Sequence, residues 1–524
     1  MRVGIGQIDS LVGAFEQNAA RILERIDEAR GRGCELVLFP EFAVPGAFPL
    51  DLVLRPGFVE GCEDAIDEIR RGAEGIAVVV GSIAPEKRRG VRPQLRNCSY
   101  VIENASIVTR IDKTHVPTDE ARYFAPGPGA QTVDVASRRL GVSLGDPLEA
   151  GEGPIDLLAS LGAEWIVQLA ASPFRVGKLR ALRRQAAESA IENGVGIVYV
   201  NCVGGADGTV FDGGSFAADQ GGNLVFQAPC FEEGLYVFEI DSAEPIEEPN
   251  EDALDLTRSA IVLGTRDYVT KNGFSSVIVG LSGGIDSALV AALAVEALGP
   301  SAVTGVYLPC AHSSCDSLAD AREVSKRLGI ELIEIPAAGV HAALREALPF
   351  DPVGFVDENL QARARAVLWM ALSNARNALV LATGNKSEIA IGYCTLYGDT
   401  TGALAPIADL YKTDVYRLAK SFGDRIPNSV LQKAPSAELR PDQKDEDDLP
   451  PYDTLDALLL GLIDENASRA QLIERGFDEG LVDDVLRRFY AAEYKRRQLP
   501  PGIAVTDHPF GAARRAPLTH TYRD

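Results

Sequence analysis

The chain has 524 residues, 46% of them hydrophobic and 24% charged, which is the balance of a soluble globular protein. Because one hydrophobic core rarely grows to this length, we expect two or three domains. Acidic residues outnumber basic ones by 75 to 51, and the net charge of −24 argues against a nucleic-acid-binding surface, which needs a basic face.

The eight cysteines are scattered along the chain and form no C-x-x-C pair. This pattern argues against a disulfide framework and fits a reducing compartment. The first residues predict a short strand rather than a signal peptide, and no apolar run reaches the length needed to cross a membrane. We therefore expect a cytoplasmic protein that makes no membrane contact.

Over the first 240 residues, short apolar runs alternate with helical patterns. The predicted strands are 36–39, 76–80, 165–169 and 196–200, and the predicted helices are 18–30 and 178–193. The clearest boundary follows at 241–251, an acidic segment with two prolines, D-S-A-E-P-I-E-E-P-N-E, which predicts a linker. We therefore place a first domain at 1–243, a linker at 244–256 and a second domain at 257–524.

After the linker, the predicted strands are continuous apolar runs separated by helices. They cover 276–280, 303–308, 331–335 and 378–382. Continuous rather than alternating apolar strands, joined by helices, indicate an α/β domain with a doubly wound parallel sheet. Further on, the acidic segment 442–448 predicts an exposed charged loop rather than a metal site.

The most informative motif is S-G-G-I-D-S, residues 282–287, which follows an apolar strand and precedes an Ala-rich helix. Exposed backbone N–H groups at the start of that helix can hold an anion, and glycines let a phosphate approach closely. Asp286 can hold Mg²⁺ against the phosphates. The G-K-[ST] ending of a Walker loop is missing. The predicted ATP-binding residues of this loop are Gly280, Leu281, Ser282, Gly283, Gly284, Ile285, Asp286 and Ser287.

The loop resembles the pyrophosphate loop of the ATP-pyrophosphatase superfamily, which cleaves ATP between the α- and β-phosphates to adenylate a substrate. Downstream segments resemble the NAD synthetase family in particular. They are A-L-V-L-A-T-G-N-K-S-E at 378–388, G-Y-C-T-L-Y-G-D at 392–399, D-L-Y-K-T at 409–413, N-L-Q-A-R at 359–363, A-P-S-A-E at 434–438 and E-Y-K-R-R at 493–497.

This resemblance implies a role for each matching residue. Thr383 and Lys412 would contact ATP, and Glu388 would join Asp286 on magnesium. The residues implied to hold deamido-NAD are Asn359, Arg363, Glu388 and Lys495. The implied reaction is the ATP-dependent amidation of deamido-NAD, in which the nicotinate carboxylate is adenylated and ammonia then displaces AMP.

The first half resembles the glutaminase domain of glutamine-dependent NAD synthetases, a nitrilase-like α-β-β-α sandwich. The most specific segments are F-P-E at 39–41, A-S-P-F at 171–174 and V-F-D-G at 210–213. That family hydrolyses glutamine with a Glu, Lys, Cys triad, in which the thiolate attacks the amide. Glu41 and Lys113 stand at the first two positions, but the cysteine position falls on Gly145.

Two further features indicate that the glutaminase is inactive. Ser143 is the nearest hydroxyl, but it lies two residues away along a strand and therefore at a displaced position. The segment between Lys113 and Glu120 is about four residues shorter than the corresponding segment of that family. The positions that match glutamine contacts, Tyr123, Ser172 and Lys178, are retained.

Three hypotheses follow for the first domain. In the first, the protein is an ammonia-dependent NAD synthetase whose nitrilase-like domain serves in assembly. In the second, it is a working glutamine-dependent enzyme with an unrecognised nucleophile. In the third, the domain docks a separate ammonia source or senses a metabolite. The resemblance also implies a homo-oligomer, a dimer or higher.

Overall fold

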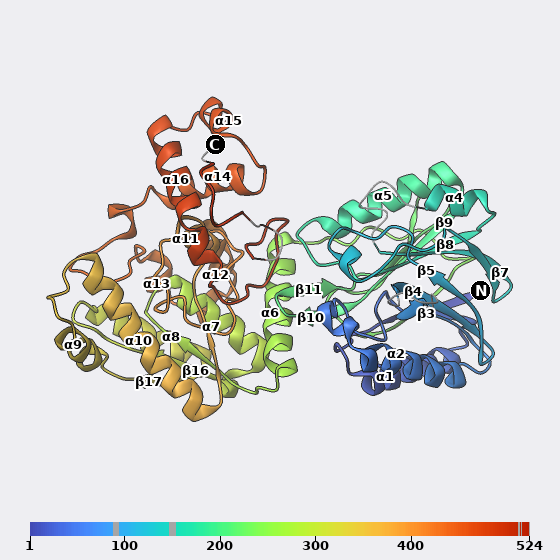
Figure 1. The fold of residues 1–524 in the computed structure, drawn as a ribbon, viewed down its shortest axis with the longest axis horizontal. Helices are drawn as coiled ribbons and strands as arrows, with labels where there is room; N and C mark the ends of the chain where they lie inside the picture. Colours follow the sequence, from blue (N-terminus) through green and yellow to red (C-terminus); the bar gives the residue numbers. More distant parts are fainter. Residues whose placement is uncertain (87–93, 146–153, 512–513, 515, 523–524) are drawn as a thin grey trace. The chain divides into compact units, whose positions relative to one another are not determined.

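The computed structural model describes residues 1–86, 94–145, 154–511, 514 and 516–522. The chain divides into two compact units, Met1–Asp252 and Ala253–Asp524 (Figure 1). The predicted domain bounds at 243 and 257 lie on either side of this division.

Two six-stranded sheets form the centre of the first unit. In the first sheet the order is β14 (Gly234–Glu239), β1 (Arg2–Gln7), β2 (Leu36–Leu38), β3 (Ala77–Glu86), β4 (Gln94–Glu103) and β5 (Ser106–Asp112). In the second sheet it is β13 (Leu224–Gln227), β12 (Phe216–Ala218), β9 (Gly196–Asn201), β8 (Trp165–Ala170), β7 (Arg138–Leu144) and β6 (Thr132–Val135). A hairpin of β10 (Val203–Ala206) and β11 (Thr209–Asp212) stands apart from both sheets.

Helices cover the outer face of each sheet, which gives four layers (Figure 1). The helices of the first unit are α1 (Phe15–Gly31), α2 (Pro56–Gly72), α4 (Ile155–Ser160) and α5 (Lys178–Asn193), with short 3₁₀ turns at Leu50–Leu54 and Glu120–Arg122. A buried cluster that includes Val3, Leu38, Val142 and Val167 fills the space between the sheets. Residues of these strands alternate between this cluster and a helix-facing one, which fixes the strand register.

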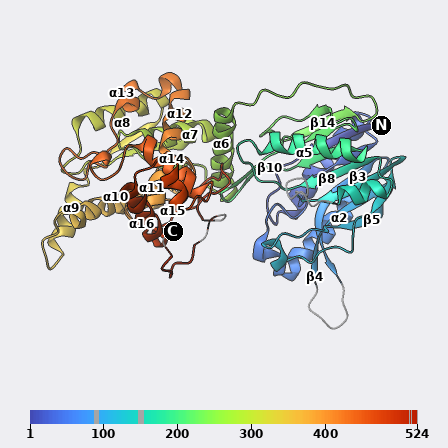
Figure 2. The same ribbon diagram turned by 90° about the horizontal axis from the view of Figure 1, so that it is seen from above.

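The second unit contains a parallel sheet in the order β17 (Glu331–Glu334), β16 (Val303–Tyr307), β15 (Val277–Gly280) and β18 (Leu379–Leu381). Ile278 packs in a cluster with residues of α10, whereas its neighbours Val277 and Val279 point to the other face. Helices α10 and α9 lie side by side in both views (Figures 1 and 2). Helices on both faces of a parallel sheet are the predicted doubly wound arrangement.

The longer helices of this unit are α6 (Ala253–Lys271), α7 (Ile285–Leu298), α8 (Cys315–Leu328), α9 (Ala338–Glu346), α10 (Phe355–Arg376), α12 (Lys412–Ser421), α14 (Tyr452–Ile463) and α16 (Glu479–Ala491). The shorter helices are α11 (Lys386–Ile391), α13 (Asn428–Gln432), α15 (Arg469–Glu474) and α17 (Glu493–Arg496). Three 3₁₀ turns cover Pro300–Ala302, Gly423–Arg425 and Asp445–Asp447.

The segment that was predicted to be a linker returns to the first unit before it ends. The guanidinium of Arg183, on α5, donates to Glu251 Oε1 at 2.7 Å and to Glu251 Oε2 at 2.9 Å. Arg183 is 3% exposed, so this bidentate pair is shielded from water and from salt. The pair holds the end of the acidic segment on α5.

None of the described helices combines the length and the apolar character needed to span a bilayer. All eight cysteines lie in described parts of the chain, and each is a free thiol. The prediction that the protein has no disulfide framework is therefore confirmed.

The core between the two sheets offers a direct test of the fold of the first unit. Leu38 is fully buried there, so Leu38→Ala is expected to lower the free energy of unfolding by about 2–5 kcal/mol. Leu157, 51% exposed on α4, is the matched control, and Leu157→Ala is expected to change it by less than about 0.5 kcal/mol. Urea unfolding followed by Trp165 fluorescence in a Trp369→Phe background, in which no other tryptophan is left, measures both. Equal effects of the two substitutions would contradict the assignment of this core.

Candidate functional site

A cavity of about 240 Å³ lies in the second unit at the carboxyl ends of β15, β16 and β18. The chain adds β16 and β17 on one side of β15 and then returns to place β18 on the other. Ligands of doubly wound sheets bind at such a reversal. The predicted residues that line the cavity are Gly280, Leu281, Ser282, Gly284, Ile285, Asp286, Ser287, Thr383, Glu388 and Lys412.

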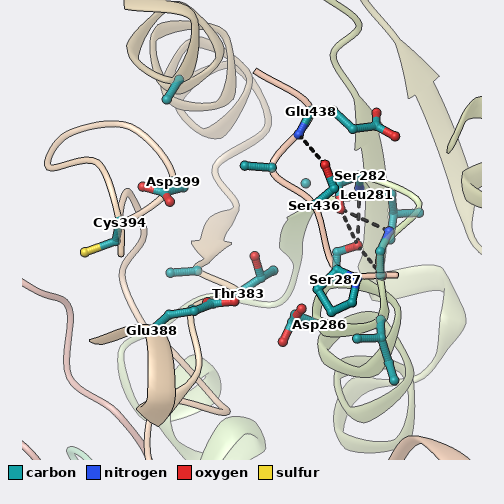
Figure 3. A pocket seen from close by; sticks show the side chains of 18 of the residues that line it. Leu281, Ser282, Asp286, Ser287, Thr383, Glu388, Cys394, Asp399, Ser436 and Glu438 are labelled. Atoms are coloured by element: carbon teal, nitrogen blue, oxygen red, sulfur yellow. Dashed lines mark hydrogen bonds between the residues drawn. The ribbon is translucent and has the colours of Figure 1, made fainter. Parts of the chain in front are cut away.

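The predicted phosphate loop is closed by hydrogen bonds among its own hydroxyls (Figure 3). Ser287 Oγ accepts from Ser282 N at 3.2 Å and donates to the Gly284 carbonyl at 3.0 Å. Ser282 Oγ accepts from Gly284 N, also at 3.2 Å. At Gly283, an added Cβ would lie 2.5 Å from the carbonyl oxygen of Ser317, so this position requires glycine. These contacts hold the loop in place at the start of α7, beside the cavity.

Lys412 lies at the centre of the acidic side of the cavity. Its ammonium nitrogen is 2.5 Å from Asp286 Oδ2 and 3.4 Å from Glu388 Oε1. Asn385 begins α11 with a reciprocal capping box to Glu388, and its side-chain amide donates to Asp286 Oδ1 at 2.9 Å. The cap and the ion pairs therefore bring Asp286, Glu388 and Lys412 together from three separate segments.

Burial controls the protonation of this group. It raises the pKa of Glu388 to about 8, against the attraction of Lys412 and with the help of the negative Asp286. Burial alone would lower the pKa of Lys412, but Asp286 and Glu388 outweigh it and raise this pKa above its ordinary value. The lysine therefore stays charged, and Glu388 holds a proton below about pH 8 that a bound cation would displace.

This donor set fits magnesium. The described residues contain no cluster of three or more His, Cys, Asp or Glu side chains with the geometry of a metal site. Mg²⁺ in nucleotide sites, however, normally takes one or two carboxylates and completes its shell with phosphate oxygens and water. Asp286 and Glu388, which reach the same lysine nitrogen, supply those two carboxylates.

The other residues predicted to hold deamido-NAD lie beside the cavity and hold the segment 392–399 in place. Thr395 Oγ1 donates to Asn359 Oδ1 at 2.6 Å, and Arg363 Nε donates to the Leu396 carbonyl at 3.2 Å. Lys495 Nζ donates to the carbonyls of Gly392 and Cys394. In this structure their polar groups are occupied by the backbone and side chains of that segment.

One sequence prediction is wrong in part. The acidic segment 442–448 is exposed over most of its length, but Gln443 and Asp445 are buried, and Asp445, only 4% exposed, lines the cavity. Tyr452 donates to Asp445 Oδ2 at 2.9 Å, and burial raises the pKa of this carboxyl group. Charge density along the chain could not single out this one inward-facing carboxylate.

Sequence reasoning also missed side chains that complete the cavity. Arg365, Trp369, Lys433 and Glu438 line it, although only Glu438 falls in a segment used for the family resemblance. Burial would raise the pKa of Glu438, but hydrogen bonds from Ser317 and the charge of Lys433 outweigh it and lower this pKa.

In the first unit, a buried network joins Glu41 and Lys113, the two residues predicted at triad positions. Lys113 Nζ lies 2.9 Å from Glu41 Oε1 and 2.8 Å from Glu120 Oε1. Asn97 Nδ2 donates to Glu41 Oε1 at 2.6 Å, and the backbone N–H of Ala171 donates to Glu41 Oε2 at 3.1 Å. Burial raises the pKa of Glu41, with Lys113 opposing and Glu120 reinforcing the shift. The network can hold a proton and a positive charge in an apolar setting.

Gly145 lies directly against this network, at the end of β7. Its N–H donates to the Leu169 carbonyl at 2.9 Å, and its carbonyl accepts from Gln168 Nε2 at 3.0 Å. Its φ is +87°, and an added Cβ would lie 2.7 Å from Lys113 Cε and 3.0 Å from Lys113 Nζ. Lys113 therefore occupies the space into which a side chain at this position would project. Residues 146–153, which complete the predicted nucleophile segment, lie outside the described residues.

The remaining predicted glutamine-pocket residues flank this network. Tyr123 follows the turn that carries Glu120 and donates to Asp51 at 2.9 Å. Ser172 donates its backbone N–H to Asn201, while its buried hydroxyl has no hydrogen-bond partner in the described structure. Lys178 is the first residue of α5 and is half-buried, and Ser143 is buried within β7.

Comparisons with known proteins match both units. A carbon-nitrogen hydrolase model covers residues 2–247, and an NAD synthase model covers residues 257–500. The glutamine-dependent NAD(+) synthetase of Synechocystis sp. is 39% identical over 99% of both chains.

Two solved structures extend this result. The glutamine-dependent NAD(+) synthetase of Acinetobacter baumannii, solved in complex with adenosine diphosphate, is 34% identical, with a TM-score of 0.78 over 99% of this chain and 98% of that one. The enzyme of the same name from Cytophaga hutchinsonii, 21% identical with a TM-score of 0.85 over 99% and 98% of the chains, supports the fold alone. The predicted fold class is confirmed.

The contact between Gly145 and Lys113 predicts a specific loss of stability. Gly145→Ala combines a left-handed backbone with overpacking and is expected to lower the free energy of unfolding of the first unit by about 2–4 kcal/mol. Gly177, with a φ of +83° and no atom near its added Cβ, is the matched control, and Gly177→Ala is expected to cost about 1–2 kcal/mol. Denaturant unfolding of both variants measures the difference. If Gly145→Ala costs no more than Gly177→Ala, Lys113 does not fill this space.

Proposed function

Because this chain belongs to the glutamine-dependent NAD(+) synthetase family, we propose that it forms NAD(+) from deamido-NAD and ATP, and that it takes the nitrogen from free ammonia. The products are NAD(+), AMP and pyrophosphate. The synthetase function rests on the match over the whole chain. The choice of ammonia rests on Gly145, which stands where the family resemblance places the nucleophilic cysteine.

The cavity of the second unit supports the first half-reaction. A nicotinate carboxylate oxygen attacks the α-phosphorus of ATP, the bond from that phosphorus to the bridging oxygen breaks, and pyrophosphate leaves with the electron pair. The N–H groups at the start of α7 and the ammonium of Lys412 would offset the charge of the phosphates. Asp286 and Glu388 would hold Mg²⁺, which supplies further positive charge against the phosphate oxygens.

The second half-reaction requires ammonia to be positioned next to the carbonyl carbon of the acyl adenylate. Ammonia attacks the carbonyl carbon, loses a proton, and AMP leaves as the carbon–oxygen bond breaks. Positioning of the two reactants accounts for most of the rate enhancement of such a step. The residues assigned to deamido-NAD, Asn359, Arg363 and Lys495, hold the segment 392–399 at the edge of the cavity and would position the dinucleotide.

Ammonia from the first unit would require a nucleophile at the Glu41–Lys113 pair. Glycine cannot form a thioester, and Lys113 occupies the adjacent space. Ser143 lies within β7, two residues before Gly145, so its hydroxyl is displaced from the cysteine position. A glutamine-dependent enzyme is the alternative function that family membership favours, and docking of a separate ammonia source is the other.

Two further expectations belong to this proposal. A homo-oligomer is supported by the exposed apolar side chains of α10, where Phe355 is 73% and Val367 is 58% exposed. A cytoplasmic location is supported by the eight free thiols.

The nitrogen donor can be identified directly. With deamido-NAD, ATP and Mg²⁺, ammonium chloride is expected to support NAD(+) formation, whereas glutamine in ammonia-free buffer is expected to give less than about 1% of that rate, because nucleophilic attack on the amide is absent. Release of glutamate from glutamine is measured in parallel. Glutamate release coupled to NAD(+) formation would show that the first unit is a working glutaminase.

The two units are expected to contribute unequally to the ammonium-dependent rate. Asp286→Ala removes a partner of Lys412 and a proposed magnesium ligand, and is expected to lower kcat/KM by at least about 100-fold. Glu41→Ala changes only the buried network of the first unit, so the rate is expected to stay within about twofold, the scale of a change far from the reacting groups. Steady-state kinetics with ammonium chloride, on variants shown to be folded, measures both rates. Equal losses of kcat/KM in the two variants would contradict the assignment of NAD(+) formation to the second unit alone.

A further inference from the structure

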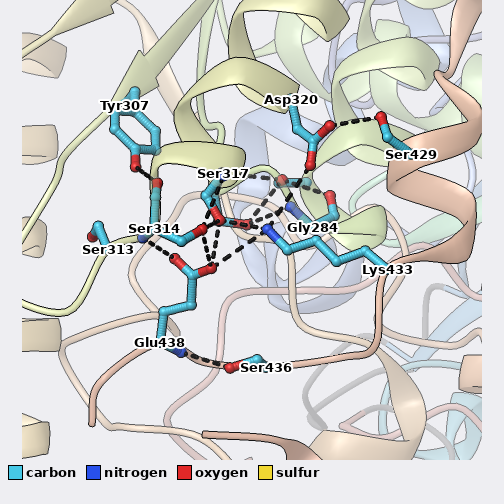
Figure 4. A network of polar contacts seen from close by, with 12 residues as sticks. Gly284, Tyr307, Ser313, Ser314, Ser317, Asp320, Ser429, Lys433, Ser436 and Glu438 are labelled. Carbon is cyan, nitrogen blue, oxygen red and sulfur yellow. Dashed lines mark hydrogen bonds and ion pairs between the residues drawn. The ribbon is translucent and has the colours of Figure 1, made fainter. Parts of the chain in front are cut away.

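Lys433, directly after α13, reaches into the cavity from a segment to which no function is assigned (Figure 4). Its ammonium donates to Ser317 Oγ and lies 3.4 Å from Glu438 Oε1 and 3.9 Å from Asp320 Oδ2. Ser317 Oγ in turn donates to Glu438 Oε1 at 2.5 Å. The ammonium is therefore held by a small polar network in the absence of a ligand.

This network adjoins the phosphate loop. The carbonyl oxygen of Ser317 lies 2.5 Å from the point where a Cβ of Gly283 would be, so the residue that holds Lys433 packs on the loop itself. Lys412 approaches from a different segment, where Asp286 and Glu388 hold it. Two ammonium groups thus approach the same loop from different elements.

The charges of the cavity distinguish Lys433 from its other cations. The described lining contains the carboxylates of Asp286, Glu388, Asp399, Glu438 and Asp445, and the cations of Arg365, Lys412 and Lys433. Arg365 donates to the Leu308 carbonyl at 3.1 Å, and Lys412, only 2% exposed, is fixed between its two carboxylates. The side chain of Lys433 is 25% exposed, and its nearest carboxylate is 3.4 Å away. It can exchange partners at a smaller cost than the buried Lys412.

We propose that Lys433 binds the β- and γ-phosphates of ATP and neutralises pyrophosphate as it leaves, exchanging Glu438 for phosphate oxygens. This inference rests on the proposed function. When the bond between the α-phosphorus and the bridging oxygen breaks, the electron pair passes to pyrophosphate, and the Lys433 ammonium donates to the oxygens on which that charge appears. Lys433 is then a catalytic residue that reaches the phosphates from a different element than Lys412.

Binding of inorganic pyrophosphate to the full chain in the presence of Mg²⁺, measured by titration calorimetry, tests this role without the need for turnover. Lys433→Met is expected to weaken pyrophosphate binding by about 10- to 100-fold, the value of one charge-assisted hydrogen bond. Binding of AMP, which lacks these phosphates, is expected to change by less than about twofold. Lys433→Arg keeps the charge and is expected to recover most of the affinity for pyrophosphate.

Glu438→Gln separates this role from a purely structural one. It removes the negative charge beside Lys433, so pyrophosphate is expected to bind equally well or more tightly. If Lys433 only ties its segment to α8, Lys433→Met and Glu438→Gln weaken pyrophosphate and AMP alike, and the inference is overturned. Unchanged pyrophosphate binding by Lys433→Met overturns it as well.

Two controls separate a loss of binding from a loss of folding. Thermal unfolding is recorded for each variant, and Lys433→Gln replaces Lys433→Met under the same criteria if the latter shows no cooperative transition. A chain that binds pyrophosphate as described but forms no NAD(+) would contradict the proposed function and leave this phosphate site in place.

Discussion

The buried ammonium of Lys412 connects three segments of the second unit that line its cavity. It joins the start of α7, through Asp286, to the start of α11, through Glu388, while Lys412 itself begins α12. Burial of a single charge would be strongly unfavourable, and these two carboxylates compensate it. Glu388, whose pKa burial raises to about 8, becomes a second carboxylate ligand for a divalent cation once it gives up its proton. One ion network therefore sets both the local fold and the affinity for a charged ligand.

Much of this site could be predicted because its determinants are local in sequence. The turn at Ser282–Ser287 follows from a strand, two glycines and a helix within a dozen residues, and the structure has that arrangement. The strands of the sheet are continuous apolar runs, so their type and approximate bounds are readable. Glu41 and Lys113 could be paired from the family pattern, and they form an ion pair.

The rest depends on partners that are remote along the chain. Lys386 and Lys412 each begin a helix, but Lys386 is wholly buried against Asp409 at 3.0 Å, whereas Lys412 lines the cavity. No spacing rule distinguishes a structural lysine from a ligand-binding one when the partners come from other elements. The same holds for Asp445, whose burial is fixed by Tyr452, and for Lys433, whose position is fixed by α8.

The contact between Gly145 and Lys113 has an evolutionary consequence. A substitution that returns a side chain to position 145 meets the lysine and a left-handed backbone before it restores any chemistry. A side chain at position 145 is therefore expected to need a compensating shift of Lys113 and of its partners Glu41 and Glu120. Residue 145 and the lysine are expected to vary together rather than one at a time.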